Sequence, residues 1–367
     1  MTASSGNYLY RLDHLRFFAA LLVMLFHFRN GSELTYLHDN SLRDMLILCV
    51  ASGKDGVSLF LVLSGFLFTY LAQGGAKPIV YSKFIYNRIL RIYPLLTLIF
   101  LAIICVQREQ STPMDVLRLL LLQLNTGQHG TGWGNDALPI GLIWTVAVEF
   151  QFYLLFPVLM RYVREQGYWP LLGVIALLNM FKLLIMLRSG NQIYFELYHS
   201  TLGRLDQFLV GIISAMLYLR HPQVVKTLFT TYGWPILGAL VLLFLLYFRL
   251  EFGHITLLHA VPGFFIEAVL WALVILTYIH LNLRLHPRIN RLLCALGERS
   301  YSIYLLHFML GEELLKHIKI EQFGILANGV LNTLFLVLPI TLIVADISYR
   351  CVERPFMAMR VGYFKTS

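Results

Sequence analysis

The sequence is poor in charged residues and in cysteine. Only 13% of its 367 residues are charged and 58% are hydrophobic, whereas an average soluble domain is about 25% charged. This balance excludes an ordinary soluble domain and indicates an integral membrane protein. The four cysteines, Cys49, Cys105, Cys294 and Cys351, are widely separated, so they indicate neither a disulfide framework nor a metal site.

Several catalytic motifs are also missing. Ser64 lies in VLSGF, which lacks the first glycine of the G-x-S-x-G elbow of serine hydrolases. The sequence has no Walker A motif, no G-x-G-x-x-G loop and no His/Cys cluster with metal-ligand spacing. It therefore gives no basis for a serine hydrolase, an ATPase or a nicotinamide enzyme, and it predicts no metal.

The sequence is rich in long apolar stretches, each close to the length that a bilayer requires. There are ten: residues 12–29, 56–73, 83–106, 139–160, 169–187, 202–219, 233–248, 259–281, 301–315 and 325–349. The first carries charges inside it and has no A-x-A-like cleavage site, so we expect it to be retained. The sequence predicts an all-α, multi-pass membrane protein of about ten transmembrane helices, with residues 1–367 forming one integral-membrane domain and no soluble domain.

The formal net charge of +9 is distributed unevenly over the loops. With ten spans both termini lie on one side, and placing them in the cytoplasm puts most of the Lys and Arg residues there as well. The positive-inside rule favours this orientation. We therefore predict cytoplasmic termini and interpret the charge as a topology signal, not as a nucleic-acid-binding surface.

The first apolar stretch contains charged and titratable residues, in RLDHLRFFAALLVMLFHF. A charge at membrane depth costs about 3 kcal/mol or more and by default marks a functional site. Arg16 and His27 are eleven residues apart, so they share one helix face at an axial separation of about 16 Å. Asp13 lies near the same stripe. A neutral imidazole at the position of His27 would suit general-base chemistry on a substrate hydroxyl.

The third stretch opens with KFIYNRILRIYP, in which Arg88 and Arg91 project from one helix face. Two guanidinium groups at the cytoplasmic entrance could clamp phosphates, or they could be an ordinary positive-inside anchor. In the fourth stretch Glu149 and Gln151 lie deep among apolar residues. Glu149 requires a partner, so it either pairs with an arginine of another helix or lines a catalytic cavity.

Two further segments place polar residues within apolar stretches. Arg204 and Asp206 lie in TLGRLDQFLVG and are either buried or anchors at the interface. In ERSYSIYLLHF, Tyr304 and His307 share a helix face. A lone histidine on an apolar face is more often a core residue than a catalyst, and we interpret His307 in that way.

The longest interval between spans, residues 107–138, is expected on the outer side. Its glycine- and asparagine-rich part indicates irregular backbone. Trp133, Asn135 and Asp136 would suit sugar stacking and hydroxyl recognition at the rim of an acceptor site. A plain connecting loop is the alternative.

Taken together, the motifs resemble the integral-membrane acyltransferase 3 family, which acylates bacterial surface glycans. The matching stretches follow the family's order over nearly the whole chain: LDHLRFFAALLVMLFHF, GVSLFLVLSGFLFTY, FIYNRILRIYPLL, IWTVAVEFQFYLLFP, GRLDQFLVGIISA, SYSIYLLHF and VERPF. The R-x10-H pair and the R-x-x-R pair are the most specific of them. Some family members append a periplasmic hydrolase-like domain, and we expect this chain to be a stand-alone form without one.

The resemblance implies transfer of an acyl group, usually acetyl, from cytoplasmic acyl-CoA to a sugar hydroxyl at the outer face of the bacterial inner membrane. It implies that Arg16, His27 and Glu149 are catalytic and that Arg88 and Arg91 bind the donor; no metal is implied. The expected partners are the membrane lipid, a glycan acceptor such as O-antigen or exopolysaccharide, and glycan-assembly proteins. Candidates for binding the acceptor or for supporting the catalytic residues are Asp13, Ser64, Trp133, Tyr304 and His307.

Several questions stay open at the level of sequence. Transfer could be direct or pass through an acyl-imidazole on His27, and Arg16, Ser64 and Tyr304 are candidates for stabilising the oxyanion. A transporter or exporter of a small polar metabolite is the main alternative, because such proteins also carry intramembrane charges. A structural subunit of a glycan-assembly complex is a third.

Overall fold

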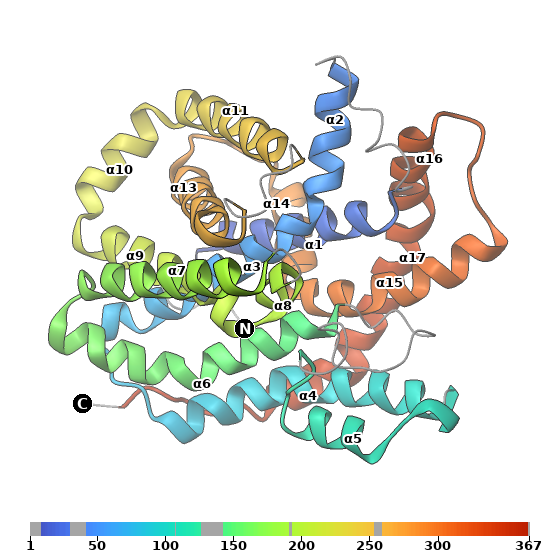
Figure 1. Ribbon diagram of the computed structural model, residues 1–367, viewed down its shortest axis with the longest axis horizontal. Coiled ribbons are helices and arrows are strands. Elements are labelled where there is room, and N and C mark those ends of the chain that lie inside the picture. The colour runs from blue at the N-terminus through green and yellow to red at the C-terminus, as the bar shows by residue number, and fades with distance from the viewer. Residues whose placement is uncertain are drawn as a thin grey trace.

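The computed structural model describes residues 9–29, 42–106, 108–125, 142–190, 193–252 and 259–365. The residues in these ranges are overwhelmingly helical, and their only β pairing is an isolated antiparallel bridge between Ile79 and Phe364 (Figure 1). The prediction of an all-α membrane protein is confirmed. Trp133, Asn135 and Asp136 lie outside the described residues.

The helices follow the predicted stretches closely. Their bounds are α1 Arg11–His27, α2 Leu42–Ala51, α3 Gly56–Leu71, α4 Tyr81–Val106, α5 Pro113–Leu120, α6 Ile143–Gln166, α7 Pro170–Ser189, α8 Ile193–His199, α9 Thr201–Arg220, α10 Pro222–Thr231, α11 Gly233–Phe252, α13 Phe264–His280, α14 Pro287–Glu298, α15 Ser300–His317, α16 Ile325–Leu331, α17 Leu338–Ser348 and α18 Arg354–Ala358. Short π-helical turns, Asn332–Val337 and Tyr349–Glu353, join the last three into one long helical run.

Eight helices in the described part of the chain are long and apolar enough to cross a membrane. They correspond to eight of the ten predicted spans, with ends that differ by several residues. The other two predicted spans, 12–29 and 301–315, are the helices α1 and α15. Helix α1 has 17 residues and carries three charges, and α15 carries Glu312, Glu313 and Lys316 near its end.

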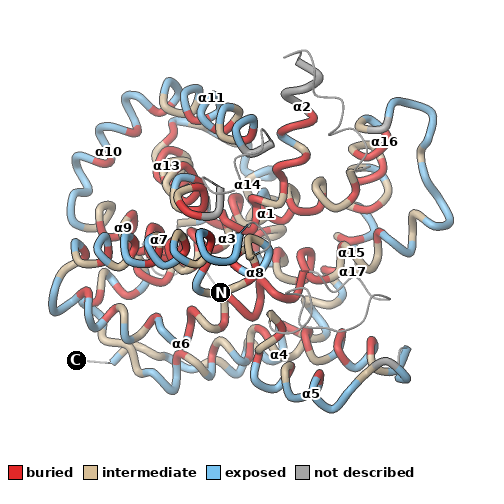
Figure 2. Tube along the Cα trace, viewed as in Figure 1, coloured by how far each residue is buried: buried red, intermediate tan, exposed pale blue. Residues whose placement is uncertain are grey.

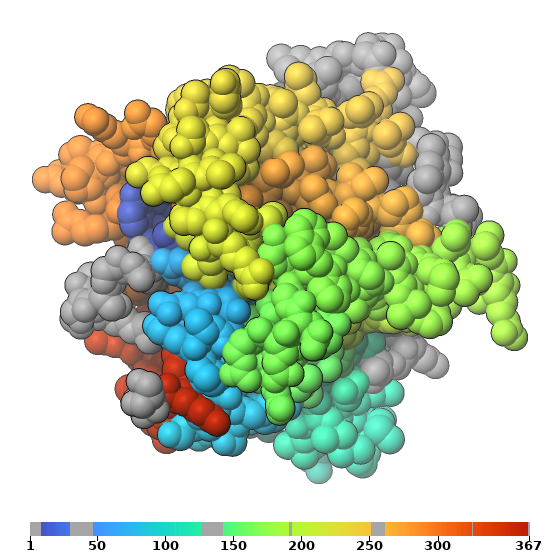
Figure 3. Space-filling model, turned by 90° about the vertical axis from the view of Figure 1, so that its left-hand side faces the viewer, coloured from blue at the N-terminus to red at the C-terminus, as the bar shows by residue number. Residues whose placement is uncertain are grey.

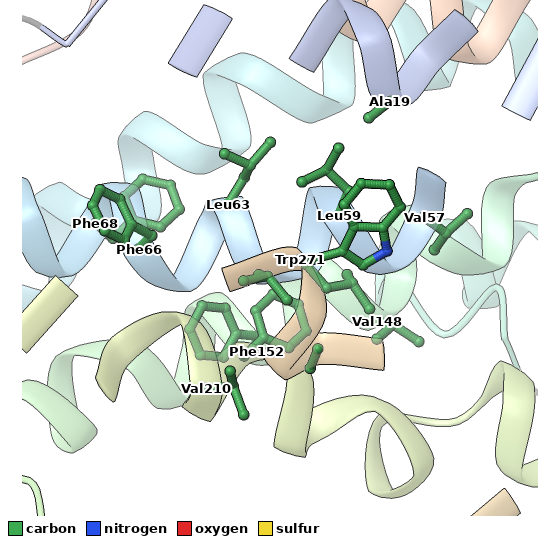
Figure 4. Close-up of a cluster of buried hydrophobic side chains, with 14 of the residues drawn as sticks. Ala19, Val57, Leu59, Leu63, Phe66, Phe68, Val148, Phe152, Val210 and Trp271 are labelled. Atoms are coloured by element: carbon green, nitrogen blue, oxygen red, sulfur yellow. The ribbon is translucent and has the colours of Figure 1, made fainter. Parts of the chain in front are cut away.

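Helices α1, α3, α9 and α13 form the centre of the bundle and hold a large share of its buried residues (Figure 2). Their side chains meet those of α6 in one continuous apolar core, which includes Ala19, Leu59, Phe152, Val210 and Trp271 (Figure 4). Of the charged residues of α1, Asp13 is buried, whereas Arg11 and Arg16 are partly exposed. Neighbouring helices thus cover part of this polar helix, which lowers the cost of its charges at membrane depth.

Small residues allow α3 and α9 to approach closely. A Cβ atom on Gly65 would lie 2.3 Å from the carbonyl oxygen of Phe208, and one on Gly211 would lie 2.3 Å from that of Val62. Any side chain at either position would push the two helices apart. Close backbone approach through small residues is a common way to pack helices in membranes.

The two described ends of the chain lie on the same side of the bundle. Arg11, in the first turn of α1, donates hydrogen bonds to the carbonyls of Tyr278 (2.6 Å) and Leu281 (2.6 Å) at the end of α13. The segment after α18 pairs with the start of α4, where the amide of Val80 donates to the carbonyl of Tyr363 (2.8 Å). Arg91 of α4 donates to the carbonyl of Glu298 (3.0 Å) at the end of α14 and so links these regions.

This shared side is basic, as the topology prediction requires. A surface pocket there is lined by basic side chains from the loop before α4, the end of α6 and the C-terminal segment: Lys77, Arg161, Arg164 and Lys365. The arrangement agrees with termini on the positive side of the membrane. That this side faces the cytoplasm stays a prediction.

Candidate active site

Two histidines from distant parts of the chain meet inside the bundle. His27 is the last residue of α1, and His307 lies in the middle of α15. Their ring centroids are 5.3 Å apart, and Nε2 of His307 lies 3.5 Å from Nδ1 of His27. His307 is fully buried, whereas His27 keeps part of its surface accessible. The interpretation of His307 as an isolated core histidine is therefore incomplete, because it contacts the candidate base.

The hydrogen bonds of the two rings define their tautomers. Nδ1 of His27 lies 2.7 Å from the carbonyl oxygen of Val23, and Nδ1 of His307 lies 3.1 Å from that of Ile303. A carbonyl oxygen can only accept a hydrogen bond, so in each neutral ring Nδ1 carries the proton and Nε2 has the free lone pair. Nε2 of His27 is therefore available to accept a proton from a substrate.

Tyr304 lies beside this pair, one turn before His307 on the same face of α15. The ring centroids of Tyr304 and His307 are 5.9 Å apart. The hydroxyl of Tyr304 lies 2.9 Å from the hydroxyl of Thr145, which donates to the carbonyl of Leu142 at 2.8 Å. The shared face predicted for Tyr304 and His307 is confirmed, and the start of α6 contributes a residue, Thr145, that the sequence analysis did not select.

Glu149, one turn further along α6, accepts two hydrogen bonds from hydroxyl groups. Ser64 of α3 donates to Oε1 at 2.6 Å, and Tyr153 donates to the same oxygen. Among the described residues no arginine forms an ion pair with Glu149, so the alternative of a structural Arg–Glu pair is not what the structure shows. Glu149 and Ser64 both keep part of their surface accessible, which fits the other alternative, the lining of a cavity.

The two arginines of α4 have different surroundings, although they are only one turn apart. Arg91 donates to Oε2 of Glu353 at 2.6 Å, and Glu353 is fully buried. The guanidinium of Arg88 lies over three aromatic rings, 4.8 Å from the centroid of Phe68 and 5.7 Å from that of Tyr153. Within the described ranges no carboxylate pairs with Arg88, and its buried Nε has no hydrogen-bond partner.

Arg16 lies in the first half of α1, toward the basic side of the bundle, as Arg88 does. Its nearest carboxylate oxygen belongs to Asp13 and is 3.9 Å away, which is a weak contact. Arg16 and Arg88 both lie within electrostatic reach of Tyr153, the partner of Glu149. Asp13 is buried against α14, where a Cβ on Gly297 would lie 2.2 Å from its carbonyl oxygen.

A second buried polar cluster lies where α7, α8, α9 and α13 meet. Lys182 and Asp206 form an ion pair of 2.6 Å in which both side chains are fully buried. The guanidinium of Arg204 lies 3.9 Å from the ring centroid of Tyr198, and its Nε donates to the carbonyl of that residue. Of the two alternatives for Arg204 and Asp206, burial is correct.

Besides Thr145, the sequence analysis did not select Lys182 or Glu353. Lys182 interrupts the apolar run LLNMFKLLIML, and this single charge could have drawn attention to it. Glu353 was quoted only within the motif VERPF. Ser302, which the sequence places with Tyr301, Tyr304 and His307 in ERSYSIYLLHF, donates to Oε1 of Glu353 and joins α15 to the Arg91 ion pair. The described residues contain no group of three His, Cys, Asp or Glu side chains that could hold a metal ion.

The site thus has two ends. Arg16 and Arg88 lie toward the basic side, Glu149 with Ser64 and Tyr153 lies between, and His27 lies at the far end of α1. This order places cationic groups suited to an anionic substrate on one side and a proton acceptor toward the other.

Comparison with known proteins agrees with the resemblance seen in the motifs. A family model described as an acyltransferase domain matches residues 9–350. The protein named "Putative O-acetyltransferase SACOL0978" of Staphylococcus aureus (strain COL) is 25% identical over 380 residues, covering 95% of this chain and 57% of the relative. "O-acetyltransferase OatA" of S. aureus (strain NCTC 8325 / PS 47) is 23% identical, covering 96% of this chain and 57% of the relative. No solved structure matches the chain.

The chain therefore spans a little over half the length of these curated relatives, in which its match covers 57%. The family model, in contrast, accounts for nearly all of the described residues, from the start of α1 to the π-helical turn after α17. The chain belongs to the integral-membrane acyltransferase 3 family.

Proposed function

We propose that this protein is a bacterial inner-membrane O-acyltransferase that moves an acetyl group from cytoplasmic acetyl-CoA to a hydroxyl of an exported or lipid-linked glycan. The observation that carries the proposal is the state of His27. Its Nδ1 proton is committed to the carbonyl of Val23, which leaves Nε2 as a proton acceptor on a side chain that is still accessible. The relatives' names, both of O-acetyltransferases, support the acetyl group.

His27 acts as the general base in this proposal. As the acceptor hydroxyl oxygen attacks the thioester carbonyl, its proton moves to Nε2 of His27 and a tetrahedral intermediate forms. The intermediate then collapses, the C–S bond breaks, and the leaving thiolate takes the proton from His27. Atoms and charge balance without a metal or an oxidant. A direct transfer of this kind requires donor and acceptor to meet at His27 from opposite sides.

His307 is proposed as a positioning residue for His27. The unprotonated Nε2 of His307 faces the Nδ1–H of His27 at 3.5 Å. This contact favours the tautomer of His27 in which Nε2 carries no proton. The contact is long for a hydrogen bond, and its contribution is therefore expected to be moderate. His307 does not need to touch the substrate.

Arg88 is proposed to bind the donor phosphates, because it is a cation without a carboxylate partner among the described residues on the basic side. Guanidinium groups recognise phosphates through paired, charge-assisted hydrogen bonds. For the oxyanion, Ser64 donates its proton to Glu149, and Tyr304 donates to the carbonyl of Leu142 at the longer distance of 3.4 Å. Tyr304 would therefore release its proton more readily than Ser64, Arg16 is the third candidate, and Glu149 orients Ser64 and Tyr153 around the path between the two ends.

The acceptor is proposed to be a glycan hydroxyl, as in O-antigen or exopolysaccharide, presented on the side opposite the basic face. The location of Trp133 outside the described residues leaves its proposed role at the acceptor rim as a prediction. Membrane lipid and glycan-assembly proteins are the further partners that we propose.

The test is transfer of label from radiolabelled acetyl-CoA to envelope glycan in membranes containing equal amounts of each protein. We expect transfer with the wild type and none with His27→Ala. His280→Ala is the matched control, because Nδ1 of His280 likewise lies 2.9 Å from a carbonyl one turn earlier, at Leu276, but on the last turn of α13. Transfer by His27→Ala at the wild-type rate would refute the assignment of the base.

A further inference from the structure

The chain continues beyond its last predicted span and folds back onto the start of α4. The side chain of Asn87 donates to the carbonyl of Val361 at 2.7 Å and accepts from the amide of the same residue at 3.0 Å. The amide of Lys365 donates to the carbonyl of Pro78 at 2.9 Å, and Tyr363 packs edge-on against Phe84 with centroids 5.4 Å apart. Residues 359–365, called the C-terminal strap below, lie on the surface beside α4 (Figure 3).

The strap brings one arginine to the donor end of the site. Asn87 holds both polar groups of the Val361 backbone, and Arg360 is the residue directly before Val361. Asn87 is in turn the neighbour of Arg88 in α4. On the other side, Met357 at the end of α18 contacts Arg91 through its sulfur at 3.2 Å. The chain on both sides of Arg360 is therefore held against α4, at Asn87 and at Arg91.

Arg360 lacks a carboxylate partner in this position. Within the described ranges it forms no ion pair, it is half buried, and its Nε is a buried donor without a hydrogen-bond partner. Burial, followed by the charges of Arg88 and Arg91, lowers the pKa of Arg360 to about 10. Positive charges that approach without neutralisation are unfavourable, so this arrangement is suited to an anion that neutralises them.

Arg91, in contrast, is committed to the protein. One of its terminal nitrogens donates to Glu353 at 2.6 Å and contacts Met357, while the other donates to the carbonyl of Glu298 at 3.0 Å. A phosphate would have to compete with a buried carboxylate for this guanidinium. Of Arg88, Arg91 and Arg360, only Arg91 forms an ion pair in the described structure, whereas the fourth arginine at this end, Arg16, contacts Asp13 at 3.9 Å.

We propose that Arg360, presented by the C-terminal strap, forms with Arg88 the site that binds the phosphate groups of the acyl-CoA donor, and that Arg91 positions this site through Glu353. The inference rests on the proposed function and adds Arg360 to Arg88 as the second phosphate-binding arginine, in place of Arg91, which the sequence analysis paired with Arg88. Arg360 lies beyond the residues 9–350 that the family model matches. The donor site therefore includes a segment outside the matched region.

The test is a titration of the purified full-length protein in detergent with CoA. We expect Arg360→Ala to weaken CoA binding by about tenfold or more, since hydrogen bonds to charged groups contribute that much. Binding of pantetheine, which has the thiol arm but no phosphate, should be unchanged. Arg354→Ala is the matched control, because Arg354 is an exposed arginine of α18 six residues earlier, and it should bind CoA like the wild type.

A second variant tests the strap itself. Asn87→Ala removes both hydrogen bonds to Val361 and should weaken CoA binding, because Arg360 is then no longer held beside Arg88. If Asn87 acts through Arg360, the double variant Asn87→Ala/Arg360→Ala should bind no more than about twofold more weakly than Arg360→Ala alone. If the two single substitutions weaken CoA binding by factors that multiply in the double variant, the strap does not position Arg360, and that part of the proposal is overturned.

The outcomes separate this inference from the proposed function. Wild-type protein that does not bind CoA would refute the donor, and the proposed function with it. Wild-type binding that Arg88→Ala weakens and Arg360→Ala leaves unchanged would overturn the role of Arg360 alone. If Arg360→Ala does not fold, Arg360→Lys takes its place, because it keeps the positive charge but not the planar guanidinium group. CoA binding by Arg360→Lys that is weaker than the wild type by about threefold or more supports the inference. CoA binding with wild-type affinity overturns it.

Discussion

The buried ion pair between Arg91 and Glu353 gives the sharpest stability prediction. Glu353 is fully buried, and its two carboxylate oxygens are each bonded, Oε2 to Arg91 at 2.6 Å and Oε1 to Ser302. The pair joins α4, α15 and the helical run after α17. Replacing Arg91 by alanine leaves the carboxylate of Glu353 inside the protein with one hydroxyl donor and no cation.

The magnitude follows from the burial of the carboxylate. Removing one partner of a buried ion pair costs about 3–5 kcal/mol, because the other charge stays desolvated without compensation. Loss of the hydrogen bond from Arg91 to the carbonyl of Glu298 adds about 1 kcal/mol. We therefore expect Arg91→Ala to lower the free energy of unfolding by about 4–6 kcal/mol.

The double variant Arg91→Met/Glu353→Gln separates this cost from simple loss of packing. It removes both charges and keeps a side chain of similar size at each position, and the Gln amide can still bond Ser302. We expect a coupling energy of about 2–3 kcal/mol between Arg91→Met and Glu353→Gln, so that the double variant recovers part of the loss. The assay is reversible unfolding in mixed micelles, followed for the wild type, Arg91→Ala, Arg91→Met, Glu353→Gln and the double variant. A loss below about 1 kcal/mol for Arg91→Ala, or strictly additive effects, would refute the reasoning.

Three further predictions follow from other contacts. Lys182→Met should destabilise the protein by about 3–5 kcal/mol because it leaves Asp206 buried without its cation. The same unfolding assay measures this loss of stability. A Lys182→Met/Asp206→Asn variant that is no more stable than Lys182→Met would contradict the prediction. Gly211→Leu should prevent assembly of α3 with α9, since its Cβ would lie 2.3 Å from the carbonyl of Val62; a monodisperse protein of wild-type thermal stability in size-exclusion chromatography would be the contrary result. His307→Phe should slow acetyl transfer by about tenfold to a hundredfold without changing CoA affinity, because His307 acts on His27 and not on the donor; unchanged transfer would remove His307 from the mechanism.

Much of the fold could be predicted from the sequence, because hydropathy is a strong signal when every backbone polar group must be satisfied within the segment. The predicted spans and the observed helices differ mainly at their ends. α1 and α15 are the two cases in which composition alone is ambiguous, since α1 carries three charges and α15 carries Glu312, Glu313 and Lys316 at its exposed end.

The site was less predictable, because the sequence shows which residues are unusual but not which of them meet. Periodicity placed Tyr304 and His307 on one face, but it could not show that this face meets His27 from a helix 280 residues away. Spacing likewise put Arg88 and Arg91 together, and only the structure shows that Glu353 neutralises Arg91 alone. Arg360 follows the last apolar stretch as one of many basic residues, and only the hydrogen bonds of Asn87 distinguish it.

The central claim is that His27 moves a proton while other groups hold the donor. The most direct measurement is single-turnover transfer, in which labelled acetyl-CoA is bound first and the appearance of label in added envelope glycan is then followed. We predict that the wild type and His280→Ala deliver the label, whereas His27→Ala binds the donor with wild-type affinity and delivers none. Delivery of the label by His27→Ala at the wild-type rate would contradict the account.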